Sequence, residues 1–256
     1  MVTLVIVPTY NERENLVRLI QAILAVDHAL DVLVVDDNSP DGTGSLAESL
    51  AQETSRLHVL HRPAKHGLGT AYLAGFRHAL ARNYSCVVEM DADLSHDPAD
   101  LPRLLAPIRS GAADLTLGSR WVSGGGTRNW PLWRQLLSRG GSWYARTILG
   151  VGVRDLTGGY KCFHRRVLES LDLAAVRSSG YSFQIELTSR ALRAGFRVQE
   201  IPIIFTERLH GRSKISWGIV AEAVGAVWRL RCAPLSPPVA RDPGERSSLA
   251  PRGSRH

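Results

Sequence analysis

The chain has few cysteines and no long apolar stretch, and each absence excludes a class of protein. Its three cysteines, Cys86, Cys162 and Cys232, are an odd number without metal-like spacing. They argue for a reducing compartment and against a disulfide-stapled secreted domain. No run reaches the ~18–20 apolar residues that a membrane-spanning helix needs. The chain begins directly with an apolar run and no basic leader, so we expect no signal peptide and a cytoplasmic protein.

Acidic residues are also in the minority, with 24 against 31 lysines and arginines, which gives a formal net charge of +7. Between Arg229 and His256, six arginines face only Asp242 and Glu245, a net of +4 that leaves +3 for the first 228 residues. Because the body is only mildly basic and its candidate site is acidic, nucleic acid is not an expected partner. The basic tail fits either attraction to anionic lipid head groups or plain solubility.

What the chain does contain is an alternation of apolar runs with helix-period segments. Five runs read as strands buried on both faces, at residues 2–7, 31–35, 58–60, 86–90 and 114–118. This pattern predicts an α/β fold with a mostly parallel central sheet flanked by helices. Asn11 is expected to cap the first helix, and Asp97 with Pro98 a later one.

After residue 118 the pattern changes. Residues 119–135 read as a long loop, and helices are predicted near 133–149 and 181–194, on either side of a glycine-rich turn at 157–160. Residues 198–205 predict a late strand in which Pro202 favours an edge or a bend. A helix is expected over 215–230. The length and the 44% hydrophobic content fit one domain over residues 1–230, followed by a disordered tail at 231–256.

The sharpest chemical signal is the triplet Asp91-Ala92-Asp93, which directly follows a buried strand. Two carboxylates there are costly unless a cation neutralises them, and a divalent ion that bridges a substrate diphosphate would do so. A solvated turn is the common alternative for an isolated D-x-D triplet. Two further strand ends carry polar groups, at residues 8–12 and 36–42, and the carboxyl ends of parallel strands share one edge of a sheet. Within the second segment, Asp41-Gly42 also fits an ordinary turn.

Six motifs in order make the chain resemble the inverting family 2 glycosyltransferases with a GT-A fold, whose central sheet is Rossmann-like. They are VPTYNERENL, VVDDNSPDGT, KHGLGTAY, MDADLSHDP, GSRW and DLTGGYKCF, and the match spans roughly residues 2–217. More narrowly, the chain resembles dolichyl- or polyprenyl-phosphate mannose synthases. That resemblance implies GDP-mannose as donor, Mg²⁺ or Mn²⁺ as metal, and a polyprenyl-phosphate mannose as product.

The resemblance also assigns roles to residues of this sequence. It places Asp91, Asp93 and Arg120 at the catalytic centre, with Asp91 and Asp93 as metal ligands and Ser95 as a further metal neighbour. The nucleotide-binding positions it implies are Pro8, Tyr10, Glu12, Val35, Asp37 and Ala92, together with Arg208 and Lys214 over the donor diphosphate.

A phosphate acceptor has to be aligned with the donor sugar and its negative charge compensated, but it does not need a general base. A phosphate monoester is largely dianionic at neutral pH, because its second pKa is near ~6, so it needs no general base. Arg120, Arg134 and Ser138 are the candidates to hold this phosphate, since guanidinium suits phosphate oxygens. For Arg134 and Ser138 the alternative is simple helix-surface polarity. In-line attack would invert the anomeric centre.

A lipid acceptor requires contact with a membrane surface, directly or through a membrane-anchoring partner protein. We expect a protein peripherally bound to the cytoplasmic face. The apolar stripe at 215–228 fits an interfacial helix or an ordinary core helix. The tryptophans at 121, 130, 133 and 143 fit either the head-group region or loop packing.

Two alternative functions remain open on the sequence. The acidic motifs do not separate mannose from glucose, so a glucosyl or other hexosyl transferase fits, as does a transferase with a soluble acceptor. A non-catalytic nucleotide-sugar-binding subunit is the second alternative. The intact D-A-D triplet with Arg120 and Lys214 counts against it.

Overall fold

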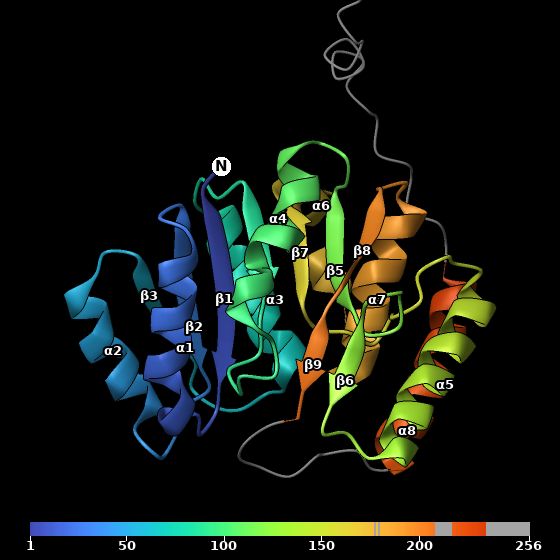
Figure 1. The fold of residues 1–256 in the computed structure, drawn as a ribbon, viewed down its shortest axis with the longest axis horizontal. Helices are drawn as coiled ribbons and strands as arrows, with labels where there is room; N and C mark the ends of the chain where they lie inside the picture. Colours follow the sequence, from blue (N-terminus) through green and yellow to red (C-terminus); the bar gives the residue numbers. More distant parts are fainter. Residues whose placement is uncertain (177, 179, 208–216, 234–256) are drawn as a thin grey trace, which may run out of the picture.

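The computed structural model describes residues 1–176, 178, 180–207 and 217–233. A seven-stranded sheet runs through the molecule in the order β3-β2-β1-β4-β7-β5-β8 (Figure 1). Its strands are β1 (Thr3–Thr9), β2 (Leu30–Asp36), β3 (Leu57–His61), β4 (Cys86–Glu89), β5 (Leu115–Ser119), β7 (Lys161–His164) and β8 (Val198–Pro202). Only β7 runs antiparallel to its neighbours, so the predicted mostly parallel sheet is confirmed.

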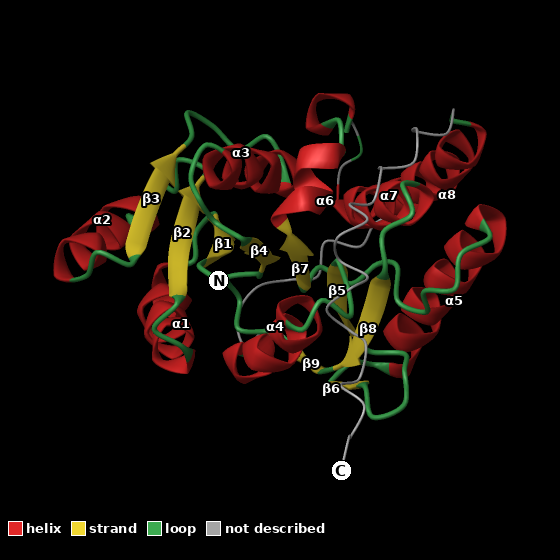
Figure 2. Ribbon diagram, turned by 90° about the horizontal axis from the view of Figure 1, so that it is seen from above, coloured by secondary structure: helices red, strands yellow, loops and turns green. Residues whose placement is uncertain are grey.

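Helices cover both faces of this sheet, which explains why its strands read as continuous apolar runs. The helices are α1 (Arg13–Val26), α2 (Thr43–Glu53), α3 (Leu68–Leu80), α4 (Leu101–Arg109), α5 (Leu132–Leu149), α6 (Arg165–Ser170), α7 (Gly180–Arg193) and α8 (Trp217–Cys232). Seen from above, α3, α6 and α7 lie on one side of the sheet and α1 and α4 on the other (Figure 2).

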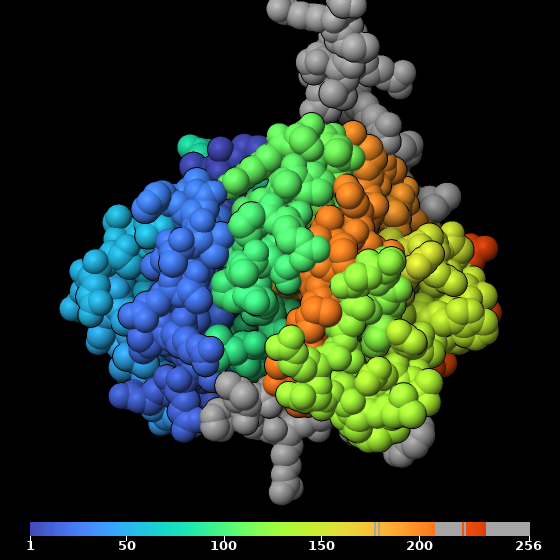
Figure 3. All heavy atoms as spheres, in the orientation of Figure 1, coloured from blue at the N-terminus to red at the C-terminus, as the bar shows by residue number. Residues whose placement is uncertain are grey.

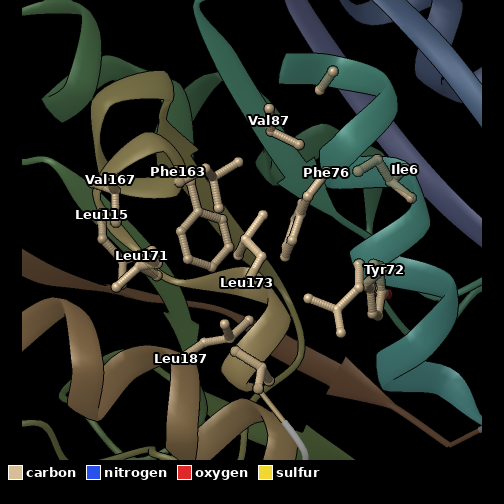
Figure 4. Packing of buried hydrophobic residues seen from close by; sticks show 14 of the residues in the cluster. Ile6, Tyr72, Phe76, Val87, Leu115, Phe163, Val167, Leu171, Leu173 and Leu187 are labelled. Atoms are coloured by element: carbon tan, nitrogen blue, oxygen red, sulfur yellow. The ribbon is translucent and has the colours of Figure 1, made fainter. Parts of the chain in front are cut away.

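Alternate residues of each strand feed two separate cores. In β1, Ile6 packs on the α3 side with Tyr72 and Phe76, while Val5 and Val7 pack on the α1 side. The first core also holds Phe163 (Figure 4). A third, smaller cluster joins α5, α7 and α8 beyond β5.

The start of α1 differs from the prediction. Asn11 does not cap the helix; it adopts a left-handed conformation with φ of 61°, and the helix begins at Arg13. The neighbouring loop supplies the acceptors instead, because Glu12 donates its backbone N–H to Thr43 Oγ1 over 3.1 Å. Asp41 Oδ1 accepts from the backbone N–H of Thr43 at 3.0 Å, as an ordinary turn residue would.

Two short strands fall where the sequence predicted one long loop and one continuous strand. β6 (Gly126–Arg128) lies within the expected loop and pairs in parallel with β9 (Ile204–Thr206). The expected strand over 198–205 is divided after Pro202, where β8 ends at the edge of the main sheet. Pro202 therefore stands at the edge and bend that the sequence indicated.

The last described helix is a core helix on its inner side. Ala226, Val227 and Leu230 of α8 are buried, with Val227 and Leu230 in the α5–α7–α8 cluster. Val224 and Trp228 are exposed, so they do not share the buried face of Val227 that the sequence suggested. The helix continues to Cys232, past the expected boundary at 230. Residues 234–256 of the predicted tail lie outside the described residues.

Candidate active site

A cavity of about 460 Å³ opens where the carboxyl ends of β1, β2 and β4 meet. The topology creates this place, because parallel strands deliver their following loops to one edge of the sheet. Residues from α5, α7 and α8 close the far side, among them Arg134, Tyr181 and Glu222. The strand-end segments at 8–12, 36–42 and 91–93 are therefore brought together as predicted.

Asp91 and Asp93 both line this cavity, with Ala92 between them. Asp91 Oδ1 accepts a hydrogen bond of 3.1 Å from the hydroxyl of Tyr72, and its backbone N–H donates to His96 Nδ1 at the same distance. Burial raises the pKa of Tyr72 well above its usual value, and the nearby carboxylates raise it further, so the phenol stays a donor. Asp93 Oδ1 accepts from the backbone N–H of Ser95 at 3.0 Å, which fixes the turn.

Ser95 itself faces away from the cavity. Its side chain is buried, and its hydroxyl has no hydrogen-bond partner among the described residues. His96, the next residue, lines the cavity instead and stacks on Tyr160 with ring centroids 4.7 Å apart. The place of Ser95 beside a metal therefore stays a prediction, and His96 is the residue of this turn whose side chain lines the cavity.

One pair of buried ionisable residues lies in the strands directly before and beside the acidic triplet. Glu89 and Lys161 are opposite each other in the β4–β7 pair and are fully buried. Burial raises the pKa of Glu89 to about 8, although Lys161 opposes the shift, and burial lowers the pKa of Lys161 to about 8. Lys161 Nζ donates to Gln184 Oε1 over 2.6 Å, and Gln184 reaches the cavity wall.

The opposite end of the cavity carries the predicted nucleotide residues. Pro8, Tyr10, Glu12 and Asp37 line it, and Lys65 Nζ sits 3.7 Å above the centre of the Tyr10 ring. Burial raises the pKa of Asp37, although Arg62 lies 3.0 Å away and opposes the shift. The side chain of Val35 is fully buried in the sheet core and does not line the cavity, so any ligand contact there falls to its main chain.

Arg120 lines the cavity but is already paired. Its Nε and Nη2 bind the two carboxylate oxygens of Asp155, each over 2.7 Å, and Nη2 also reaches Thr157. Burial disfavours charge here, yet Asp155 raises the pKa of Arg120, and Arg120 keeps the pKa of the buried Asp155 low. Gly125 lets the following loop pass close to the main chain of Ser119 and Arg120, since a Cβ there would lie 2.4 Å from the Ser119 carbonyl oxygen.

Arg134 enters the cavity from the first turn of α5. Its guanidinium lies 4.0 Å from the ring centre of Trp130 and forms an ion pair with Glu207. Its Nε has no hydrogen-bond partner among the described residues. Ser138, one turn further along α5, is half-buried and does not line the cavity. Arg208 and Lys214 lie outside the described residues.

Sequence reasoning missed Lys65, Tyr72, His96 and Gln184 as cavity or supporting residues. His96 stood in the MDADLSHDP motif directly after Ser95, and its position in that motif was the available signal. Gln184 was read only as part of a helix. Its approach to the triplet depends on α7 packing behind β7, which no local pattern encodes.

The donor set suits a hard divalent cation. No group of three or more His, Cys, Asp or Glu side chains with metal-binding geometry occurs among the residues that the structure describes. Mg²⁺ typically takes one or two carboxylates and fills its remaining positions with water and substrate phosphates. Asp91 and Asp93 on the cavity wall fit that pattern.

Comparison with known proteins places the chain among glycosyltransferases. The family model described as glycosyl transferase family 2 matches residues 4–172. The polyprenol monophosphomannose synthase of Mycolicibacterium smegmatis is 53% identical over 232 residues, which cover 90% of this chain and 87% of that protein. The undecaprenyl-phosphate mannosyltransferase of Micrococcus luteus is 50% identical over 229 residues, with 90% and 93% covered.

Solved structures share the fold at lower identity. Glucosyl-3-phosphoglycerate synthase from Mycobacterium tuberculosis, in complex with Mn²⁺, UDP-glucose and phosphoglyceric acid, aligns with a TM-score of 0.65 at 22% identity, covering 90% of this chain and 79% of that one. A mannosyltransferase from Pyrobaculum calidifontis, in complex with GDP-Man and Mn²⁺, aligns with a TM-score of 0.61 at 20% identity, covering 89% and 64%.

Proposed function

The chain belongs to glycosyl transferase family 2, and from that premise we propose that it transfers mannose from GDP-mannose to a polyprenyl monophosphate. The observation that carries the proposal is the 50–53% identity, over nine-tenths of the chain, to two proteins named for this acceptor class and for mannose. The cavity supports it, because the carboxylates Asp91 and Asp93 line the same space as Arg120 and Arg134.

On the donor side, Tyr10, Glu12 and Asp37 would bind the nucleoside, since they line the end of the cavity below β1 and β2. Asp91 and Asp93 would hold Mg²⁺ or Mn²⁺. When bound, that ion supplies positive charge to the diphosphate of the donor. Tyr72 and His96 hold the Asp91 segment through its carboxylate and its backbone N–H, which orients it before substrate arrives.

On the acceptor side, Arg134 is the strongest candidate for the phosphate. Its Nε is buried and has no hydrogen-bond partner among the described residues, so an incoming phosphate oxygen would accept a hydrogen bond from this N–H. Arg120 would contribute charge from a fixed position, because Asp155 and Thr157 hold it. The phosphate dianion is itself the nucleophile, so no side chain has to take a proton. In-line displacement would invert the anomeric carbon.

The lipid acceptor implies work at a membrane surface. No helix within the described part of the chain is long and apolar enough to cross a bilayer. Because the proposed acceptor is a lipid, we propose peripheral binding at the cytoplasmic face, on its own or with a membrane-anchoring partner protein. Nucleic acid is not among the proposed partners, since the site that the fold assembles is rich in carboxylates.

The test is transfer of radiolabelled sugar to a polyprenyl phosphate from GDP-mannose, GDP-glucose or UDP-glucose, with and without Mg²⁺ or Mn²⁺. We expect metal-dependent, organic-extractable label from GDP-mannose alone. Label from another donor would correct the sugar and keep the reaction class. Metal-dependent GDP binding without transfer from any donor would contradict the proposal and favour a nucleotide-sugar-binding subunit.

A further inference from the structure

The outer face of α5 is unusually apolar for a surface helix. Leu132, Leu136 and Trp143 are 70%, 61% and 63% exposed, and Trp133 beside them is 58% exposed. Leu132, Leu136 and Trp143 recur at helical spacing, so they lie along one side of the helix. In the surface view, α5 forms the lower right of the molecule (Figure 3). A contiguous exposed apolar surface of this kind marks an interaction site.

The same face is cationic. Arg139 and Arg146 fall between and beyond the apolar positions at the same helical spacing, and α5 has no acidic residue over its whole length. Arg134, on the other side of the helix, is buried and lines the active-site cavity. One helix thus presents an arginine to the proposed acceptor phosphate and an apolar, basic surface to the outside.

A second cavity, of about 360 Å³, lies on this outer face. It is lined by Trp121, Arg139, Trp143, Arg146 and Arg154, with no carboxylate among them. The guanidinium of Arg139 lies 4.7 Å from the ring centre of Trp121, which gives the cavity an ordered wall. Three guanidinium groups around two indole rings suit a phosphate group set at a boundary between water and hydrocarbon.

We propose that this α5 face, defined as Leu132, Leu136, Arg139, Trp143 and Arg146 with the adjoining Trp121 and Arg154, docks on an anionic phospholipid bilayer. The second cavity receives a lipid phosphate head group. Charge complementarity selects this occupant, because tryptophan and leucine enter the interface while arginines meet negative lipid. The inference rests on the proposed function, since a lipid acceptor is the reason for the active site to approach a bilayer. It assigns the docking surface to α5 rather than to the expected helix at 215–230.

The geometry explains how docking and transfer would be linked. Arg134 of the cavity belongs to the first turn of α5, and the docking face runs along the outer side of the same helix from Leu132 to Arg146. Docking of this face would therefore hold the helix that carries Arg134 at the bilayer. A polyprenyl phosphate could then present its head group to Arg134 while its tail stays in lipid.

The experiment is co-sedimentation of the full chain with phosphatidylcholine vesicles, with or without phosphatidylglycerol. We expect binding that requires phosphatidylglycerol and falls with salt. Arg146→Glu should weaken vesicle binding by about fivefold or more, because a basic charge is lost. Trp143→Ser should also weaken it, because an indole ring is removed from the interface. Trp143→Phe and Arg146→Lys should restore most of it. Arg18→Glu, on the exposed side of α1, is the matched charge reversal outside the docking face. It should bind the vesicles more tightly than Arg146→Glu does.

A second readout separates docking from catalysis. Mannosyl transfer to a short, water-soluble isoprenyl phosphate without vesicles should be unchanged in Arg146→Glu, which also shows that the variant folds. Transfer by the wild type without vesicle binding would overturn docking and leave the proposed function standing. Vesicle binding without transfer would support docking and contradict the proposed function. Equal binding to both vesicle types, or equal loss in Arg18→Glu, would also overturn the inference and point to a partner protein on α5.

Discussion

At the residue scale, the proposed site is defined by how each charged group is already held. Tyr72 and His96 hold the Asp91 segment, and the backbone N–H of Ser95 donates to Asp93 Oδ1 within the turn. Arg120 is paired with Asp155, whereas Nε of Arg134 has no hydrogen-bond partner within the part of the chain that the structure describes. These differences decide which substitutions should affect substrate and which should affect folding.

Replacing Asp93 with Ala should lower metal-dependent mannosyl transfer by about a hundredfold or more, because one of two carboxylates for the cation is lost. Initial rates over a range of Mn²⁺ concentrations measure this. Asp97→Ala serves as the control, since the Asp97 side chain is exposed and accepts a hydrogen bond from the backbone N–H of Ala99. Full activity in Asp93→Ala would remove Asp93 from the metal site.

Replacing Arg134 with Lys should raise the KM for polyprenyl phosphate by about tenfold while GDP affinity stays the same. Lysine keeps the charge but loses the planar guanidinium that can bind a phosphate and Glu207 together. Ser138→Ala should have a smaller effect, because Ser138 does not line the cavity. An unchanged KM in Arg134→Lys would assign the acceptor phosphate to another group.

At the scale of elements, β5 is tied to its neighbours by one buried carboxylate. Asp114, just before β5, accepts hydrogen bonds from Arg166 of α6 and from Arg197 beside β8. Burial alone would raise the pKa of Asp114, but these arginines outweigh it and hold the pKa at about 2. The ionised form is therefore stabilised in the folded state.

This pairing predicts a pH dependence of stability. A carboxyl with a depressed folded pKa contributes stability that is complete above its unfolded pKa, near 3.8, and is lost as the pH falls through about 2. Asp114 should contribute about 2 kcal/mol at neutral pH. Urea denaturation from pH 5 to pH 2 should show a steeper loss for the wild type than for Asp114→Asn. Parallel curves would contradict the ion-pair account.

Helix α8 offers a contrast within a single element. Val227→Asp should lower the free energy of unfolding by about 3 kcal/mol or more, since it puts an unpaired charge into the α5–α7–α8 cluster. Val224→Asp should change it by no more than about 0.5 kcal/mol, because Val224 is exposed. Thermal or urea denaturation compares the two. Similar losses would mean that α8 is buried on both sides.

At the scale of the whole molecule, ligand binding should be visible as stability. The cavity draws residues from β1, α3, α5, α7 and α8 and from the segments that follow β2 and β4, so a ligand that fills it binds only the folded chain. GDP with Mn²⁺ at about a hundred times its Kd should add about 2.7 kcal/mol and raise the Tm by roughly 5–10 °C. A chelator, or Asp93→Ala, should remove most of that shift. A shift that survives both would show metal-independent binding.

The sequence alone determined the fold class and the main strands. Helices cover both faces of the sheet, so its strands are apolar at nearly every position and read as continuous apolar runs. It also located the acidic triplet and the cavity residues at the ends of β1 and β2, since these follow strands directly in the chain. Identity to known glycosyltransferases then agreed with the family that its ordered motifs suggested.

Only the tertiary structure decided contacts between distant segments. Pairing of β7 with β4 places Lys161 opposite Glu89, and α7 brings Gln184 to the cavity. Docking of α8 against α5 and α7 buries Val227 and exposes Trp228. Asp155 reaches Arg120 across 35 positions of sequence. Local patterns report the neighbours of a residue along the chain, whereas burial and pairing depend on packing between elements, and so the sequence could name these residues without placing them.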